Sequence, residues 1–491
     1  MAKPTRPNLV LIMADDHAAQ AVGAYGSHLN ATPHIDRIAR DGMRFDACFC
    51  TNSICTPSRA SILTGTYSHI NGVTTLDTPW DARQPTFVTA LAEAGYQTAI
   101  VGKWHLGHGG IHDPRSFDHW IVLPDQGDYH DPRFLTAEGP VRLEGYATDL
   151  ITDLSLDWLA NRDPARPFGL LIHHKAPHRS WEPDEVHASR YQDAELRIPP
   201  GFDDDHSGQA PAASEARMRM ADLTESDLKA PIPVGLDVDA ESRWRWRRFI
   251  EDYLACVASI DDNVGRVLDW LDEAGLADDT VVVYTSDQGF FLGEHGWFDK
   301  RFMYEESIRM PLLVRYPREV TQASATDAMV LNVDFAPTFC DLARVPIPAR
   351  MQGRSVLPIL RGDTPADWRT SMYYRYWMHL DPAHLVQAHL GVRTTRYKLV
   401  HYPGEGAGVT GASSEERTPA WELFDLTTDP FELHSLYHDP AYASIVTDLS
   451  NELMRLRLEV GDDPARAPRR PASIEGVVRR ASSPTSDREI L

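Results

Sequence analysis

The chain has 491 residues and 42% hydrophobic content, enough for two or more structural units or for one large α/β unit with an appendage. Acidic residues outnumber basic ones, 71 to 48, and the net charge of −23 argues against a nucleic-acid partner. No apolar run is long enough to cross a membrane, so we expect no membrane partner either.

The first apolar run, Leu9–Met13, is followed directly by Asp15 and Asp16. It is too short for the core of a signal peptide and predicts a buried first strand instead. We therefore expect a cytoplasmic protein. The five cysteines are too sparse and uneven for a disulfide scaffold, and they lack the paired Cys-x-x-Cys element typical of zinc sites.

The segment Cys55–Ala60 reads Cys-Thr-Pro-Ser-Arg-Ala and predicts the start of a helix. Pro57 suits the first turn, where its missing N–H has no partner to lose, and Gly65 can end the helix. Residues four apart share a helix face, so Cys55 and Arg59 should point the same way. A nucleophile beside a cation at a helix N-terminus is well placed to meet an anionic ester. Taken alone, the segment fits a buried cysteine and a surface arginine equally well.

Short apolar runs alternate with helical patterns through most of the chain, which predicts an α/β fold with a mainly parallel sheet. The predicted buried strands are Asn8–Met13, Thr98–Val101, Phe168–His173, Val281–Thr285 and Pro311–Arg315. Helices are predicted between Thr32 and Gly42, between Pro85 and Gly95, and from Trp244 to Ala274. Residues 195–240 are rich in Pro, Asp and Ala without periodicity, which indicates an irregular surface excursion.

The pattern changes after about residue 371. Antiparallel strands are predicted over residues 391–402 and 421–426, and a helix over residues 442–460. We therefore divide the chain into a main α/β domain and a smaller C-terminal α+β subdomain, followed by a loosely held tail. These three parts span residues 1–370, 371–460 and 461–491.

Polar side chains follow four of the five predicted strands, at the point where each strand ends. In order, they are Asp15 and Asp16, Lys103 and His105, His178, and Asp287 and Gln288. Ligands bind beyond the carboxyl ends of parallel strands, so these groups should converge on one site. The three carboxylates and one amide oxygen form a set that suits a hard divalent cation, Ca²⁺ more than Zn²⁺. Lys300, in the loop after the fourth strand, would add a cation, although alone it fits an ordinary surface lysine.

These motifs, in this order, resemble the formylglycine-dependent type I sulfatases of the alkaline-phosphatase-like superfamily. The matching segments are residues 8–16, 55–60, 102–107, 175–178, 286–289, 293–300, 391–394 and 423–426. The resemblance covers about residues 8 to 440 and implies an alkaline-phosphatase-like sheet flanked by helices. One departure is Gln288, where many members of the family have Asn and some have His. Its amide oxygen can still ligate calcium.

The resemblance implies that a maturation enzyme oxidises Cys55 to formylglycine. The hydrated aldehyde would attack the sulfur of a sulfate monoester with one hydroxyl and break the covalent intermediate with the other. The resemblance also implies one Ca²⁺ per chain. Its expected ligands are Asp15, Asp16, Cys55 in its modified form, Asp287 and Gln288.

The resemblance assigns roles to the remaining polar residues. Arg59, Lys103 and Lys300 would offset negative charge on the sulfuryl oxygens. His178 would protonate the leaving oxygen, and His105 would assist collapse of the diol. A lone histidine is more often a loop or core residue, so these roles depend on the convergence of the strand ends.

Members of the family act on aryl sulfates, sulfated sugars and alkyl sulfates, so the expected ligand is a small sulfated substrate, a sugar or an aryl sulfate. The stretch His173–Trp181 resembles carbohydrate sulfatases, including those that act on 6-O-sulfated N-acetylglucosamine. We expect four residues of the C-terminal subdomain to return to the pocket rim and bind the leaving alcohol: Trp377, His379, His389 and Arg393. Taken singly, Trp377 fits a core residue and the histidines fit surface residues.

Two other functions fit parts of the sequence. A phosphonate monoester or phosphodiester hydrolase of the same superfamily would share the nucleophile motif, but those compared lack the pair Lys103 and His105. A non-catalytic, calcium-stabilised binding protein would keep the fold and lose part of the polar set, whereas here every expected member is present. The oligomeric state is open.

Overall fold

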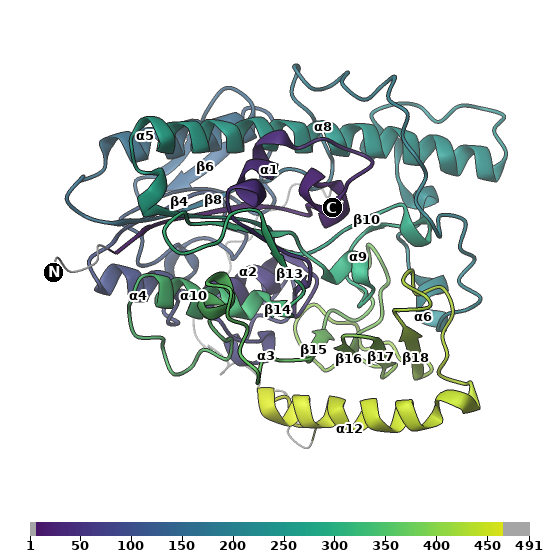
Figure 1. Ribbon diagram of the computed structural model, residues 1–491. Helices are drawn as coiled ribbons and strands as arrows, with labels where there is room; N and C mark the ends of the chain where they lie inside the picture. The colour runs from purple at the N-terminus through teal and green to yellow at the C-terminus, as the bar shows by residue number, and fades with distance from the viewer. Residues whose placement is uncertain (1–5, 465–491) are drawn as a thin grey trace, which may run out of the picture.

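A ten-stranded sheet forms the centre of the main domain (Figure 1). The structure is a computed structural model and describes residues 6–464. The strand order is β13-β2-β12-β9-β1-β8-β4-β5-β6-β7. The bounds in chain order are β1 (Asn8–Ala14), β2 (Met43–Phe45), β4 (Gln97–Lys103), β5 (His119–Leu123), β6 (Arg133–Thr136), β7 (Gly139–Arg142), β8 (Phe168–His173), β9 (Thr280–Ser286), β12 (Leu312–Arg315) and β13 (Ser324–Thr326).

Four of the predicted strands lie side by side in the middle of this sheet. β1 pairs in parallel with β8 and with β9, and β8 pairs in parallel with β4. The predicted parallel core is therefore confirmed, and the carboxyl ends of these four strands lie at one edge. The fifth predicted strand, β12, runs antiparallel to β9, and its carboxyl end is consequently directed away from this edge.

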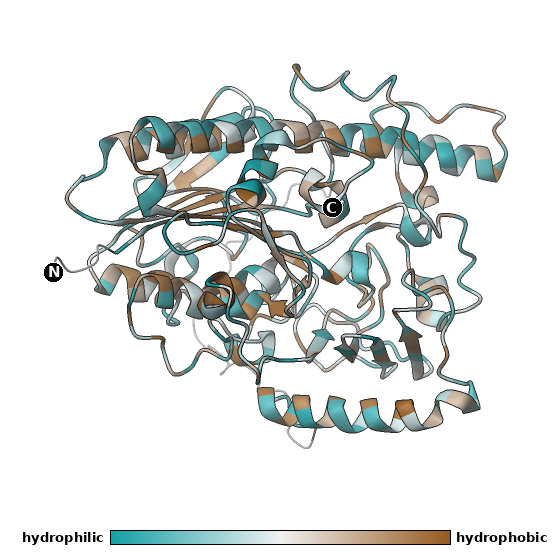
Figure 2. Ribbon diagram, viewed as in Figure 1, coloured by the Kyte–Doolittle hydropathy of each residue, from teal (hydrophilic) through white to brown (hydrophobic). Residues whose placement is uncertain are grey.

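Both faces of the central strands are buried, which explains their nearly continuous apolar sequences. Alternate residues of β1 enter two different hydrophobic clusters, Leu11 on one face and Ile12 on the other. One face is covered by α1 (Pro33–Arg40), α5 (Ala147–Asn161) and α8 (Val238–Glu273), and the other by α2 (Cys55–Thr64), α4 (Phe87–Glu93) and α10 (Phe335–Leu342) (Figure 1). Figure 2 shows the strands between these layers as mostly hydrophobic. Each Ile or Leu buried there contributes about 1.5–3 kcal/mol.

The long helix α8 begins at Val238, before the predicted start at Trp244. The early turns lack an apolar face, so periodicity did not reveal them. They are held instead by Asp237, whose side chain accepts a hydrogen bond from the Ala240 N–H at 2.8 Å. An ion pair of 2.5 Å between Arg245 and Glu241 adds to this support.

The excursion over residues 195–240 is packed more closely than its composition indicates. It contains two short helices, α6 (Pro211–Glu215) and α7 (Glu225–Leu228). Ala213 and Met218 are fully buried within it. Part of this segment therefore belongs to the core rather than to the surface.

A second, antiparallel sheet lies beside the main one, as expected for the C-terminal region. Its order is β15-β16-β17-β18, with bounds Ser371–Tyr376, His389–Thr394, Tyr397–Tyr402 and Ala420–Asp425. The first of these strands was not predicted. The helix α12 (Ala443–Val460) lies along this sheet, with Leu449 and Leu453 buried (Figure 1). Residues 465–491, most of the predicted tail, lie outside the described residues.

Short elements complete the described chain. Two strand pairs, β3 (Cys48–Phe49) with β14 (Val330–Leu331) and β10 (Phe291–Leu292) with β11 (Phe298–Asp299), lie outside the two sheets. The remaining short α-helices are α3 (Ser68–Asn71), α9 (Glu305–Ile308) and α11 (Leu357–Leu360), and several single-turn 3₁₀-helices lie between the larger elements. Between residues 6 and 464, no helix combines the length and the apolar character that a bilayer crossing requires.

Candidate functional site

The site begins at the N-terminus of α2, as predicted. The helix starts at Cys55 and ends at Thr64, and it is capped by Gly65, whose φ of 64° is the left-handed conformation that glycine adopts most easily. Every residue of α2 is buried, and Cys55 is only 1% exposed. Burial raises the pKa of the Cys55 thiol to about 12, so an unmodified thiol there is neutral.

The acidic residues at the ends of β1 and β9 meet beneath this helix. Carboxylate oxygens of Asp15, Asp16 and Asp287 lie within 4.8 Å of one another. Asp16 adopts a left-handed φ of 66°, and its N–H donates to Asp287 Oδ1 at 3.2 Å. The Gln288 side-chain amide contacts both Asp16 Oδ1 and, at 4.0 Å, Cys55 Sγ. The structure thus brings together all five residues expected to hold a metal ion.

This acidic group fits a hard divalent cation. Asp15 Oδ1 and Gln288 Oε1 are buried oxygens without a hydrogen-bond partner in the described part of the chain. Burial, together with the neighbouring carboxylates, raises the pKa of Asp16 and of Asp287, so the negative charges crowded there are costly. A bound cation would offset that cost, and oxygen atoms are the ligands that Ca²⁺ prefers.

Three cationic side chains surround the carboxylates. Arg59 Nε lies 2.9 Å from Asp287 Oδ2, and Arg59 Nη2 lies 3.2 Å from Asp15 Oδ2. Lys103 Nζ pairs with Asp15, and Lys300 Nζ lies 2.6 Å from Asp16 Oδ2. Asp16 and its neighbours hold the pKa of Lys300 well above its ordinary value, although burial alone would lower it. All of these groups are buried, so removing one partner would leave an uncompensated charge.

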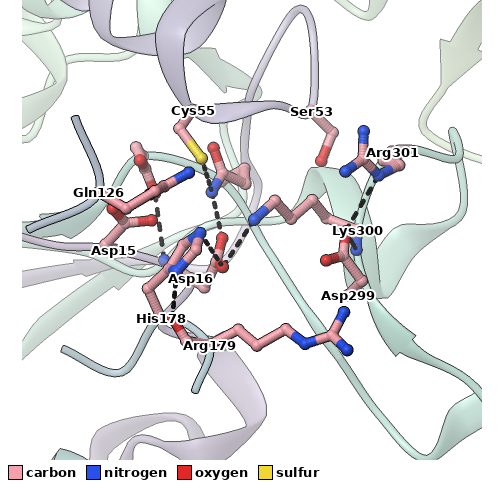
Figure 3. A network of polar contacts seen from close by, with 12 residues as sticks. Asp15, Asp16, Ser53, Cys55, Gln126, His178, Arg179, Asp299, Lys300 and Arg301 are labelled. Atoms are coloured by element: carbon pink, nitrogen blue, oxygen red, sulfur yellow. Dashed lines mark hydrogen bonds and ion pairs between the residues drawn. The ribbon is translucent and has the colours of Figure 1, made fainter. Parts of the chain in front are cut away.

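His178 and His105 stand at the edge of this group. A ring nitrogen of His178 lies within 4.8 Å of Cys55 Sγ and a carboxylate oxygen of Asp15. His178 Nδ1 lies 2.7 Å from the Arg179 carbonyl oxygen. A carbonyl oxygen can only accept a hydrogen bond, so Nδ1 carries the proton. The other ring nitrogen, Nε2, faces the site and lies 3.7 Å from Asp16 Oδ2 (Figure 3). The His105 carbonyl accepts a hydrogen bond from Thr56 Oγ1 at 3.0 Å, which ties the end of β4 to the start of α2. Burial lowers the pKa of both histidines, and Lys103 lowers it further.

The four residues expected at a substrate-binding rim all make contacts with other parts of the protein. Arg393 makes a two-pronged ion pair with Glu305 at 2.9 Å, and His389 is 1% exposed in a ring of aromatic side chains. His379 Nε2 lies 2.9 Å from the Glu415 carbonyl oxygen. The Arg375 guanidinium lies 3.5 Å from the centre of the Trp377 ring, which lines a separate pocket of 710 Å³. The assignment of these four residues to a rim that binds the leaving alcohol stays a prediction.

Sequence reasoning missed two groups next to the predicted residues. The Gln126 side chain, in the loop after β5, accepts a hydrogen bond from Lys103 Nζ. Asp299 and Arg301, on either side of Lys300, form a 3.2 Å ion pair (Figure 3). Gln126 also follows the carboxyl end of a parallel strand, so the rule applied to the other four strands would have found it if β5 had been predicted.

Comparisons with known proteins bear on the same elements. The profile of the Sulfatase family matches residues 7–345, and that of N-sulphoglucosamine sulphohydrolase, C-terminal, matches residues 293–459. An N-acetylglucosamine-6-O-sulfatase of Bacteroides thetaiotaomicron is 40% identical over 506 residues, covering 92% of this chain and 85% of that protein. The N-acetylglucosamine-6-sulfatase of Homo sapiens is 30% identical over 438 residues, covering 84% and 70%. A solved structure of a protein in complex with its substrate, D-glucosamine-2-N,6-O-disulfate, matches with a TM-score of 0.87 and 38% identity, covering 95% of this chain and 100% of that one.

Proposed function

This chain belongs to the sulfatase family and is a sulfuric ester hydrolase. On that premise, we propose that it removes the 6-O-sulfate from a glucosamine unit whose nitrogen carries an acetyl or sulfo group. The observation that carries this proposal is the similarity along almost the whole chain to proteins described as acting on, or binding, 6-O-sulfated glucosamine. The fold is of the alkaline-phosphatase-like type. The product would be the free sugar and inorganic sulfate.

The proposed nucleophile is Cys55 after oxidation to formylglycine by a maturation enzyme. The position of Cys55 supports this assignment, because its sulfur lies within 4.8 Å of both a candidate metal ligand and a candidate proton donor, Asp15 and His178. The hydrated aldehyde supplies one hydroxyl for attack on sulfur and a second that allows the enzyme to release sulfate.

We propose one Ca²⁺ per chain, held by the modified Cys55 and by Asp15, Asp16, Asp287 and Gln288. The all-oxygen donor set and the buried unpaired oxygens of Asp15 and Gln288 support this assignment. When bound, the ion supplies a Lewis acid that polarises the sulfate ester.

The remaining residues would bind and orient the sulfuryl group and move protons. Lys103 and Lys300 lie beside the carboxylates and would contact the sulfuryl oxygens, while Arg59 holds Asp15 and Asp287 in position. His178, as an imidazolium with a second proton on Nε2, would donate that proton to the sugar O6 as the S–O bond breaks, which matters because a primary alkoxide is a poor leaving group. His105 would take the proton when sulfate leaves.

A panel of sulfated sugars tests the substrate assignment. The protein, produced together with a maturation enzyme, is incubated with N-acetylglucosamine 6-sulfate, N-sulfoglucosamine 6-sulfate, their 3-sulfate isomers, N-acetylgalactosamine 4-sulfate and the monophenyl ester of phenylphosphonic acid, whose hydrolysis is followed by phenol release. Sulfate release should be fastest by at least about tenfold from a 6-sulfated glucosamine, a difference of about 1.4 kcal/mol in transition-state binding. Cys55→Ala is the matched control and should release none. Equal rates on the 6- and 3-sulfates, or a preference for the phosphonate, would contradict the proposal.

A further inference from the structure

A second group of potential metal ligands lies away from the carboxyl edge of the sheet. It consists of Asp204, from the excursion before α8, His206 two residues later, and His295 from the loop between β10 and β11. Asp204 Oδ2 lies 3.4 Å from His206 Nδ1 and 3.3 Å from His295 Nδ1. Both imidazoles are almost completely buried. One carboxylate oxygen is thus shared between two histidine rings that come from distant parts of the sequence.

Hydrogen bonding alone does not satisfy this arrangement. Gln209 lies across it, with Oε1 2.7 Å from His206 Nδ1 and Nε2 3.1 Å from His295 Nδ1. A ring nitrogen carries either a proton or a lone pair. If His295 Nδ1 accepts a bond from the Gln209 amide, its lone pair faces the Asp204 carboxylate at 3.3 Å, and if it donates to Asp204, its proton faces the amide N–H. Turning the Gln209 amide over only moves the same conflict to His206.

The surroundings of His295 suit a ring that binds a cation through Nδ1. In that state the proton lies on Nε2, which faces Glu306 Oε2 at 4.0 Å. Neither of these two atoms has a hydrogen-bond partner elsewhere within residues 6–464. A metal-bound histidine commonly directs its second nitrogen at a carboxylate, which fixes the tautomer and the ring orientation.

Packing holds both rings in place for this role. The His206 ring stacks on the Trp297 ring with 4.6 Å between ring centres, and the His295 ring stacks on the Tyr304 ring with 4.9 Å between ring centres. Both histidines adopt left-handed backbone conformations, with φ of 60° and 57°, which are uncommon for residues with a side chain. Such strain is retained where the surrounding structure fixes the side-chain position.

We propose that Asp204, His206 and His295 bind a divalent transition-metal ion, Zn²⁺ by the chemistry of its donors, at a site separate from that of Ca²⁺. Two imidazoles and one carboxylate are the donors that Zn²⁺ prefers, and Gln209 Oε1 would supply the fourth position after moving away from its present 2.7 Å contact with His206 Nδ1. Zn²⁺ ligands at 2.0–2.2 Å in a tetrahedron are about 3.3 Å apart, which agrees with the 3.3 and 3.4 Å separations here. The ion removes the conflict around Nδ1, because both lone pairs then point to a cation.

The ion would have a structural role. It joins the excursion that contains Asp204 to the loop that leads from His295 to Lys300, a residue beside the acidic site. Gln209 extends the connection, since its Nε2 donates to the Glu432 carbonyl oxygen at 2.9 Å. Three distant segments would therefore be held at one point. The proposal does not depend on which sulfate ester is the substrate.

Metal content and thermal stability test this proposal directly. Protein without a histidine tag is stripped with a chelator, saturated with Ca²⁺ and then titrated with Zn²⁺. Elemental analysis after buffer exchange should find one Zn²⁺ per chain in addition to Ca²⁺. The Tm should rise by roughly 2–3 °C at free Zn²⁺ about 100-fold above its Kd.

Two substitutions that nearly keep the size of the side chain distinguish Zn²⁺ binding at this site from binding at the other carboxylates. Asp204→Asn and His206→Gln should lose at least about tenfold in Zn²⁺ affinity, as expected when a metal ligand is replaced, and should keep their Ca²⁺. His108→Gln is the control, because His108 is exposed at the surface, and it should bind Zn²⁺ like the parent protein. The proposal is overturned if the Ca²⁺-saturated parent binds no Zn²⁺, a result that needs no variant to fold. It is also overturned if both ligand variants retain Zn²⁺ with unchanged affinity.

Discussion

At the scale of single residues, the orientation of His178 sets the expected chemistry. Its Nδ1 proton is directed at the Arg179 carbonyl, 2.7 Å away, so only Nε2 can exchange a proton with a ligand at Cys55. We expect His178→Ala to lower kcat/KM for a 6-O-sulfated sugar by about 10²–10⁴ and to affect 4-nitrophenyl sulfate far less, because nitrophenolate leaves without a proton. Steady-state kinetics on both substrates measure the difference.

His105→Ala is the comparison for this prediction. If His105 acts on the diol, which is common to all substrates, its loss should slow both substrates equally. Equal losses in His178→Ala would assign that residue to positioning instead.

Gln126 is expected to act through Lys103. Its side-chain oxygen accepts a hydrogen bond from Lys103 Nζ, which also pairs with Asp15. We predict that Gln126→Ala lowers kcat about tenfold, or about 1.4 kcal/mol, on sugar and aryl sulfates alike while KM changes little, since a sulfuryl contact would weaken in the transition state. Gln84→Ala, a variant at a residue that bonds to the Asn71 carbonyl, is the control and should leave both constants unchanged. A rise in KM on sugar substrates alone would instead make Gln126 a sugar contact.

At the scale of elements, two strand ends are expected to depend on one ion. β1 and β9 are parallel neighbours, and the three carboxylates that follow them, Asp15, Asp16 and Asp287, crowd together beside the arginine and the two lysines described above. Chelation should therefore remove activity and lower the Tm by linkage, and Ca²⁺ should restore both. Mg²⁺, which requires a tighter octahedral shell, should restore them poorly.

Asp287→Asn is the variant for this test. It removes one of the three carboxylates while keeping the size of the side chain, and it should need more Ca²⁺ for the same Tm. Fully active enzyme without any divalent metal would contradict the assignment.

The sequence predicts some elements better than others, for physical reasons. β1, β4, β8 and β9 are buried on both faces, so their apolar runs are unmistakable, and the residues after them mark the site. β6 and β7 lie at the sheet edge with several exposed residues, and they leave no such pattern.

The C-terminal residues show a different limit of sequence reasoning. His389 and Arg393 share one face of β16, because they are an even number of residues apart. The sequence does not reveal which part of the protein packs against that face of β16. The structure packs it against Phe302 and Glu305, a tertiary contact that the strand's own sequence does not indicate.

At the scale of the whole molecule, Arg393 helps to hold the small sheet against the main domain. Its guanidinium pairs with Glu305 at the start of α9, and Lys398 Nζ lies 3.0 Å from the same carboxylate. We expect Arg393→Ala to lower the free energy of unfolding by about 3 kcal/mol, because the largely enclosed carboxylate of Glu305, 16% exposed, loses its main partner. The KM for an aryl sulfate should not change. Denaturant unfolding and steady-state kinetics measure the two effects.

Arg396→Ala is the matched control. Arg396 pairs with Asp425 on the same sheet, but its own side chain is 54% exposed and Asp425 keeps a hydrogen bond from the Thr427 N–H, so this variant should lose no more than about 1 kcal/mol. Equal destabilisation by the two variants would show that burial is not what makes the Arg393 pair important.

The complete burial of α2 determines whether Cys55 can be modified before or after the protein folds. Cys55 is 1% exposed and every residue of its helix is buried, so another enzyme cannot bind this segment once the sheet and helices have folded. Any oxidation of Cys55 by another protein must therefore happen while the segment is still extended, during or soon after synthesis. A chain that folds before this oxidation keeps an unmodified Cys55 thiol, and another protein could oxidise that thiol only after the chain unfolds.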